Sequence, residues 1–95
     1  MRFEWDHKKG KSNRRKHGVD FDEAATVFAD PLAAVFDDEI HSEDERREII
    51  IGFSATGRLL VVAFTDRGED LVRVYSARPA TRTELMEHEE HWRTR

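Results

Sequence analysis

The chain has 95 residues, of which 38% are hydrophobic and 38% are charged. This length suits one small domain over residues 1–95 and excludes two-domain enzymes and (β/α)₈ barrels. The sequence contains no cysteine, which excludes disulfides, thiolate metal sites and cysteine nucleophiles. Its longest apolar run, residues 59–64, is far below the roughly 20 residues of a membrane helix. We therefore expect a cytoplasmic protein with no membrane segment.

The net charge of −4 conceals strong segregation along the chain. Residues 1–18 contain seven Lys or Arg and two acidic residues, whereas residues 19–45 contain ten acidic residues and no Lys or Arg. Nucleic-acid binding depends on the local field of a basic patch rather than on the total charge. The acidic total therefore does not exclude a polyanionic partner.

The N-terminal region predicts a short strand at residues 3–5 and a helix over residues 7–17. Asp6 is suited to cap the start of this helix, and Gly18 stands where a left-handed residue ends a helix. A second helix is expected to end at Asp30, because the residue before a proline avoids the helical region. Its apolar residues recur at helical spacing: Phe21, Ala24, Ala25 and Phe28.

The rest of the chain predicts strands and one further helix. Strands are expected at residues 33–38, 48–55, 59–65 and 71–77, with an acidic loop at 39–45 and turns at 55–57 and 66–70. Thr81 and Glu84 form a capping box that starts a C-terminal helix, in which Leu85 and Trp92 share one face. The predicted fold is α+β: a small antiparallel β-sheet meander with two N-terminal helices and one C-terminal helix, in the order β-α-α-β-β-β-β-α.

The most prominent local feature is the basic stretch, since six of residues 8–17 are Lys or Arg. Such a stretch can form a phosphate-contact surface, with Asn13 as a base or sugar contact. The alternative is a solvated helix whose charge balances the acidic block that follows.

Arginines in or beside the predicted strands are a second feature. An arginine at a strand end can bind a phosphate in bidentate fashion and stabilise charge on it. An ion pair is the alternative, and it is favoured for Arg46, which has acidic neighbours. Arg73 is expected to face away from the flanking valines, Val72 and Val74. Arg78 would lie on the same face of the sheet as these valines only if the strand stays regular.

Histidines and carboxylates could serve as acid–base groups or metal ligands. Either His17 or His41 could act as general acid or base near neutral pH, although capping and surface positions are more common for such residues. His88 and His91 on the last helix, or the acidic loop, could in principle hold a metal. A solvated role is more common for both, so neither a metal site nor a cofactor is predicted.

Several motifs stand in a specific order and spacing over nearly the whole chain. They are Phe3-Glu4-Trp5-Asp6, Asn13 to Val19, Phe21 to Ala24, Val27 to Asp30, His41, Glu45-Arg46, Ile51-Gly52, Thr65-Asp66-Arg67, Arg73, Ser76 to Thr81 and Glu84. Together these motifs resemble the BrnT family of bacterial type II toxins.

The resemblance implies a RelE-like fold and a ribonuclease that blocks translation. It also implies a BrnA-type antitoxin with a ribbon-helix-helix DNA-binding part, which forms a heterotetramer with the toxin. That complex represses its own operon, so operator DNA is contacted only through the antitoxin.

The resemblance and the residue types suggest a metal-independent cleavage site. We expect Arg78 to stabilise charge, with Arg67 and Lys16 positioning the phosphate and His17 acting as general base or acid. Further RNA contacts are expected from Trp5, as a stacking surface, and from Lys8, Lys9, Asn13 and Arg15. The alternative function is a non-enzymatic subunit that binds nucleic acid or the antitoxin.

Overall fold

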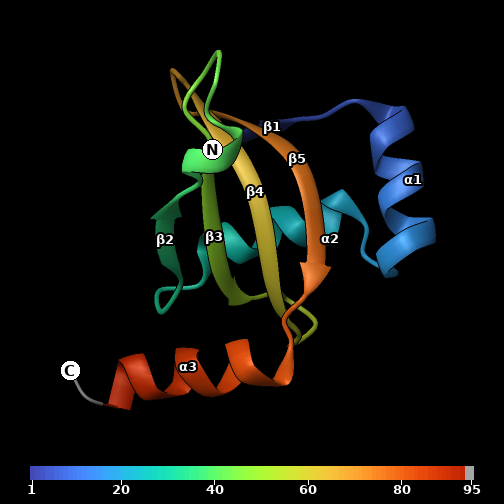
Figure 1. Cartoon of the computed structure of the whole chain (residues 1–95). Coiled ribbons are helices and arrows are strands. Elements are labelled where there is room, and N and C mark those ends of the chain that lie inside the picture. Colours follow the sequence, from blue (N-terminus) through green and yellow to red (C-terminus); the bar gives the residue numbers. More distant parts are fainter. Residues whose placement is uncertain (94–95) are drawn as a thin grey trace.

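The computed structural model describes residues 1–93 and contains one five-stranded sheet in the order β1-β5-β4-β3-β2 (Figure 1). The strands are β1 (Arg2–Glu4), β2 (Ala34–Asp37), β3 (Glu48–Phe53), β4 (Leu59–Gly68) and β5 (Leu71–Pro79). The helices are α1 (His7–His17), α2 (Phe21–Thr26) and α3 (Arg82–Arg93), and two short 3₁₀ helices are η1 (Val27–Ala29) and η2 (Glu39–His41). The predicted α+β class and element order are confirmed.

The sheet differs from the expected meander at its first strand. Strands β2 to β5 are joined by antiparallel pairing, but β1 lies parallel to β5 at one edge. Strands β4 and β5 are also longer than predicted, since β5 continues to Pro79. β4 continues to Gly68, because its connection to β5 is a tight turn at Glu69 and Asp70. Both residues have positive φ, at 52° and 63°, which is the left-handed geometry of a two-residue hairpin turn.

Helix α2 and η1 cover one face of the sheet and form the core with it (Figure 1). Two of the apolar residues predicted for the second helix, Phe21 and Ala24, are buried in this core. Gly52 of β3 lets the strand approach this layer closely. A Cβ atom at that position would lie 2.8 Å from Cβ of Ala33 and 3.0 Å from Cγ1 of Val27.

Helix α1 lies beside β5 and is anchored there by a buried carboxamide (Figure 1). Asn13 Nδ2 donates to the carbonyls of Ala77 (2.8 Å) and Val19 (3.0 Å), while Oδ1 accepts the Ala77 amide at 3.0 Å. β1 pairs with β5 only as far as Arg73. The Asn13 side chain therefore bonds the backbone N–H and carbonyl of Ala77 at the edge of β5, beyond the part of β5 that pairs with β1.

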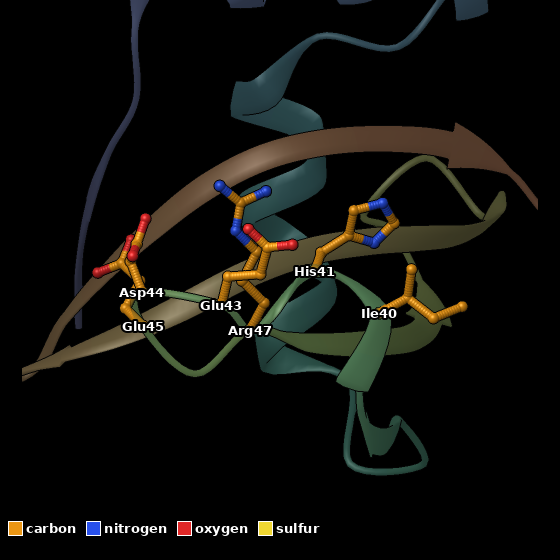
Figure 2. A pocket seen from close by; sticks show the side chains of 6 residues that line it. All are labelled: Ile40, His41, Glu43, Asp44, Glu45 and Arg47. Atoms are coloured by element: carbon orange, nitrogen blue, oxygen red, sulfur yellow. The ribbon is translucent and has the colours of Figure 1, made fainter.

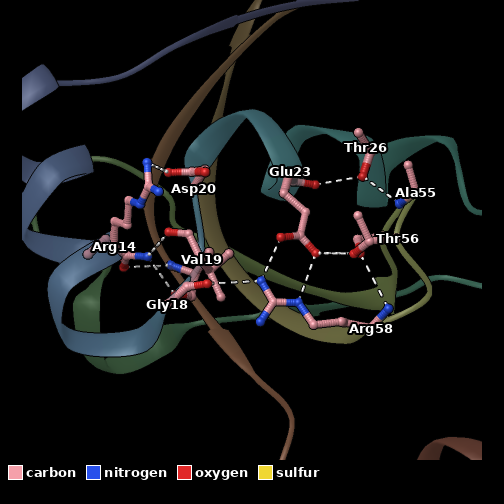
Figure 3. Close-up of polar contacts among 12 residues, drawn as sticks. Arg14, Gly18, Val19, Asp20, Glu23, Thr26, Ala55, Thr56 and Arg58 are labelled. Carbon is pink, nitrogen blue, oxygen red and sulfur yellow. Dashed lines mark hydrogen bonds and ion pairs between the residues drawn. The ribbon is translucent and has the colours of Figure 1, made fainter.

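A polar network ties α2 to the turn between β3 and β4 (Figure 3). Arg58 donates to both carboxylate oxygens of Glu23, at 2.6 and 3.0 Å, and to the Gly18 carbonyl at 3.0 Å. The hydroxyls of Ser54 and Thr56 also donate to Glu23. Arg58 and these hydroxyls lower the pKa of Glu23 to about 2.

Helix α3 crosses the lower end of the sheet in Figure 1 and begins at the predicted capping box. Thr81 N–H donates to Glu84 (2.8 Å), and Glu84 N–H donates to the Thr81 hydroxyl (3.1 Å). Leu85 and Trp92 are only half-buried, whereas His88 on the same face is buried and meets the Phe53 ring edge-on. No helix among residues 1–93 is long and apolar enough to cross a membrane.

Candidate active site

A β-bulge in β5 determines which side chains face away from α2. Val72 and Val74 lie in the core, and so does Ala77, three residues further along. The register between β4 and β5 shifts between Ala63 and Phe64, leaving an extra residue in β5. Such a bulge reverses the alternation of side chains beyond it. Arg78 therefore faces the open side of the sheet, whereas a regular strand would have turned it into the core.

On this open side, α1, β5 and the loop after β2 enclose a surface hollow of about 340 Å³, which we call the basic groove. Its floor is formed mainly by apolar side chains of β3 and β4, and its walls carry cationic side chains and two imidazoles. The lining residues are Lys9, His17, Asp38, His41, Arg47, Ile49, Val61, Ala63, Tyr75, Ser76, Ala77 and Arg78.

The loop at residues 38–47 is closed at its base by hydrogen bonds. Asp38 N–H donates to the Arg47 carbonyl at 2.9 Å. The Ser42 hydroxyl donates to the Asp38 carbonyl at 2.6 Å and accepts the Arg47 amide at 2.9 Å. These bonds hold the two ends of the loop together. Figure 2 shows His41 and Arg47 rising on the same side of the loop, while Ile40 is directed away from them.

His41 is oriented by a carboxylate. Its Nδ1 lies 2.9 and 3.1 Å from the two carboxylate oxygens of Asp38, whose side chain is only 11% exposed. An Nδ1 in this position carries the proton that bonds the carboxylate, so a neutral ring presents its lone pair on Nε2. That arrangement gives the groove a fixed proton acceptor.

Arg47 packs on the face of Tyr75, with its guanidinium carbon 3.9 Å from the ring centroid. Lys9 lies 5.6 Å from the same centroid, so two cations flank this ring. The Tyr75 hydroxyl donates a short hydrogen bond to Glu45, which also accepts from Arg67 at 3.0 Å. These bonds lower the pKa of Glu45, with the Tyr75 hydroxyl as the largest cause. The ring is thereby fixed at both its face and its hydroxyl.

The arginines of the sheet differ in whether a carboxylate already neutralises them. Arg78 makes a bidentate pair with Glu84, at 2.7 and 2.8 Å, and this pairing lowers the pKa of Glu84 to about 2. Arg46 and Arg73 pair with Asp37 and Glu4. Arg47 has no carboxylate within 4.0 Å among residues 1–93. Arg47 and Lys9 are therefore the groove cations that make no ion pair within the described residues, and an incoming phosphate would meet both.

Only some of the predicted site residues lie in the basic groove. His17, Arg78 and Lys9 line it, and they come from α1 and the end of β5 as expected. Arg67 does not line it: its guanidinium pairs with Glu45 at 3.0 Å and lies 3.9 Å from Glu4. Its contact with Glu45 connects it to Tyr75, whose hydroxyl donates to the same carboxylate.

Several residues that were expected to contact RNA, in α1 and in the segment just before it, lie outside the basic groove. Asn13 is 6% exposed, and its amide bonds backbone groups of Val19 and Ala77 inside the fold rather than lining the groove. Trp5 is half-buried and meets the Phe21 ring edge-on at 5.8 Å, outside the groove. The remaining expected contacts are exposed on α1 but do not line the groove: Lys8, Arg15 and Lys16.

Arg47 and Tyr75 line the groove although the sequence did not single them out as site residues. The sequence indicated Asp38 only as a metal ligand beside the acidic loop, and Ser76 only as part of a family motif. Arg47 stands in the run Glu45-Arg46-Arg47-Glu48, where acidic neighbours favoured an ion pair for Arg46, and Arg46 does form one. The spacing of Asp38 and His41 was a usable signal, because residues three apart in one helical turn can contact each other. No group of three or more His, Asp or Glu side chains in residues 1–93 is arranged to hold a metal ion.

The fold and the groove define a small α+β protein with clustered cations on its exposed sheet face. A family model described as "Ribonuclease toxin, BrnT, of type II toxin-antitoxin system" matches residues 5–84, so the chain belongs to the BrnT family. A crystal structure of the Brucella abortus ribonuclease toxin BrnT aligns with a TM-score of 0.66 and 27% sequence identity, covering 86% of this chain and 99% of that chain. The search of curated proteins found no match.

Proposed function

We propose that this chain is an endoribonuclease toxin that cleaves RNA in the basic groove without a metal ion. Membership of a family described as ribonuclease toxins gives the activity class. The groove supplies two imidazoles and several cations beside an apolar floor. The observation that carries the proposal is Arg47, an arginine without a carboxylate partner in residues 1–93 that lies in the same hollow as both histidines.

The reaction is an in-line attack by the ribose 2′-oxygen on the adjacent phosphorus. His41 Nε2 takes the proton of the 2′-hydroxyl, and Asp38 holds the ring through Nδ1. A bond forms between the 2′-oxygen and phosphorus, and the bond to the 5′-oxygen breaks. His17, on the α1 wall, gives a proton to the leaving 5′-oxygen. The products are a 2′,3′-cyclic phosphate and a free 5′-hydroxyl.

Charge on the reacting phosphate is stabilised by Arg47, with Arg78 and Lys9 contributing from the other walls of the groove. Arg78 shares its guanidinium with Glu84, which fixes its position but offsets much of its charge. Preorganised donors at such sites are each worth roughly 3–4 kcal/mol of barrier. Tyr75, held by Glu45, offers a ring on which a neighbouring base can stack.

The partner in this proposal is an antitoxin of the BrnA type, with a ribbon-helix-helix part that binds operator DNA. Membership of a type II toxin–antitoxin family implies an antitoxin. We propose that the two proteins form a heterotetramer in the cytoplasm and that the toxin contacts the operator only through the antitoxin. In this proposal the exposed basic side chains of α1 bind RNA and make no contact with operator DNA.

The test is cleavage of single-stranded RNA by the purified chain, freed of antitoxin, in excess EDTA. We expect products ending in a 2′,3′-cyclic phosphate. The same oligonucleotide with a 2′-deoxyribose at the cleaved position should remain intact, because the attacking hydroxyl is missing. Loss of cleavage in EDTA, restored by Mg²⁺, would refute the metal-independent mechanism.

A non-enzymatic subunit is the competing function, and growth separates the two. Expression of the chain without its antitoxin should arrest bacterial growth if it cleaves RNA. A subunit that only binds a partner would leave growth unchanged. An Arg47→Ala variant expressed to the same level serves as the matched control for the effect of expression itself.

A further inference from the structure

Exposed apolar side chains gather along the edge of the sheet formed by β2. Val35 and Phe36 are 52% and 51% exposed, and Leu32 and Ile40 beside them are 47% and 83% exposed. β2 is the terminal strand of the sheet and pairs only with β3 within the described chain. Its outer edge therefore combines unpaired backbone groups with a large apolar surface, which soluble proteins generally keep small.

Two surface hollows flank this edge, one on each face of the sheet. On the α2 side, Val35 lines a hollow of about 450 Å³ with Phe28 and Phe64 in its wall. On the opposite face, Phe36 lines a hollow of about 370 Å³ that reaches His88 of α3. Successive side chains of a strand point to opposite faces. A strand added to β2 would therefore place alternate side chains in the two hollows.

The rims of both hollows are acidic. Four carboxylates border the hollow on the α2 side: Glu48, Asp66, Glu69 and Asp70. Glu84 and Glu87 border the hollow beside α3, and Glu84 is already paired with Arg78. No lysine or arginine is among the lining residues of either hollow, although the Met1 amino group pairs with Asp70 at 2.9 Å and Arg46 lies 3.9 Å from Glu48. Glu69 and Asp66 make no ion pair within the described residues. A segment that fits this edge thus needs apolar side chains for the hollows and Lys or Arg residues to meet their rims.

We propose that the free edge of β2 is the docking site of an extended, basic and apolar segment of the antitoxin, which adds a sixth strand to the sheet. Main-chain hydrogen bonds would supply affinity, and the two hollows would select alternate side chains. A second copy of this chain is a poorer occupant, because pairing two β2 edges brings two sets of acidic rims together. The identity of the partner rests on the proposed function, whereas the docking site rests on the edge itself.

The test uses the full chain and the protein encoded beside it as the antitoxin. Calorimetric titration compares the wild type with a Val35→Lys/Phe36→Lys double variant, whose substitutions lie on exposed side chains. We expect the Kd to rise about 100-fold, because central apolar anchors carry most interface energy. The matched control is Met86→Lys, a 60% exposed apolar residue of α3 outside both hollows, which should change the Kd less than about threefold.

Hydrogen exchange provides a second readout that does not depend on substitution. Amides of residues 34–37 should exchange more slowly in the complex than in the free chain. An unchanged Kd for the double variant, unchanged exchange in β2, or no binding of the antitoxin to the wild type would each overturn the proposal. Wild-type self-association that the double variant abolishes would also overturn it, by making a second copy the occupant.

The RNA cleavage assay separates this inference from the proposed function. β2 lies outside the basic groove, so the double variant should cleave RNA at the wild-type rate. If the wild type does not cleave RNA but the Val35→Lys/Phe36→Lys variant no longer binds the antitoxin, only the ribonuclease proposal is refuted. If the wild type and the double variant cleave RNA and bind the antitoxin equally well, only the docking-site proposal is refuted.

Discussion

The guanidinium carbon of Arg47 lies over the ring of Tyr75, 3.9 Å from the ring centroid, and this contact joins the acidic loop to β5. The loop contributes His41 to the same hollow, and β5 contributes Arg78. The contact therefore fixes the relative positions of groups that come from distant parts of the sequence. It also keeps one arginine beside the groove without an acidic partner among the described residues.

The first prediction concerns this arginine. Arg47→Ala should lower kcat/KM for RNA cleavage by about 100-fold or more, the usual cost of removing one preorganised donor to a developing anion. Arg46→Ala is the matched control, because Arg46 pairs with Asp37 and does not line the groove. Initial rates on a fluorescent RNA oligonucleotide measure both variants. Equal losses in the two would show that overall charge, rather than this site, accounts for activity.

The second prediction concerns the pair of His41 and Asp38. His41→Asn should reduce cleavage by roughly 10²–10⁴-fold, the contribution of a positioned general base. Asp38→Asn should cause a smaller loss, because the carboxylate only orients the ring. His7→Asn, on the exposed start of α1, serves as control. Full activity of His41→Asn would assign proton removal to another group.

The third prediction separates structural from RNA-binding roles in α1. Asn13→Ala leaves the buried amide and carbonyl of Ala77 without their partners, at about 1–3 kcal/mol for such groups. Urea denaturation should therefore show a clear loss of stability. Lys16→Ala, one turn further along the exposed surface, should leave stability nearly unchanged. A stable Asn13→Ala variant with weakened RNA binding would contradict the structural role.

The fourth prediction concerns acid stability and the network around Glu23. Its pKa falls from 4.5 to about 2 in the folded chain, so this carboxylate stabilises the fold above pH 4.5, and the contribution is lost as the pH falls towards 2. Allowing for solvent around Arg58, we expect about 2 kcal/mol at neutral pH.

Urea denaturation of Glu23→Gln across this pH range tests the network. The deficit of the variant relative to the wild type should be largest at pH 7 and should shrink towards pH 2. Asp22→Asn, at the exposed neighbouring position, should show no such trend. A deficit independent of pH would mean that the variant fails for reasons of packing.

Local signals in the sequence predicted most of the fold. Caps at Asp6 and Thr81 and the apolar spacing from Phe21 defined helices that the structure contains. The parallel placement of β1 could not be predicted, because it depends on a long-range pairing with β5 that no short motif encodes. The β-bulge in β5 could not be predicted either, although Pro79 indicated an irregularity of the strand near Arg78.

The site was harder to predict because charge alone does not reveal which partner a side chain takes. Asn13 looked suited to a nucleic-acid contact, yet its amide completes the edge of β5. Arg67 looked suited to a phosphate, yet it supports Glu45. Arg46 and Arg47 are adjacent in sequence, and only the path of the loop decides that one is paired and the other faces the groove.

The most direct measurement is a crystal structure of the His41→Asn variant with an RNA whose attacking hydroxyl is methylated. The account predicts the scissile phosphate in the basic groove, within hydrogen-bonding distance of the Arg47 guanidinium, with His17 near the 5′-oxygen. RNA bound instead along the exposed side of α1, with the groove empty, would contradict it.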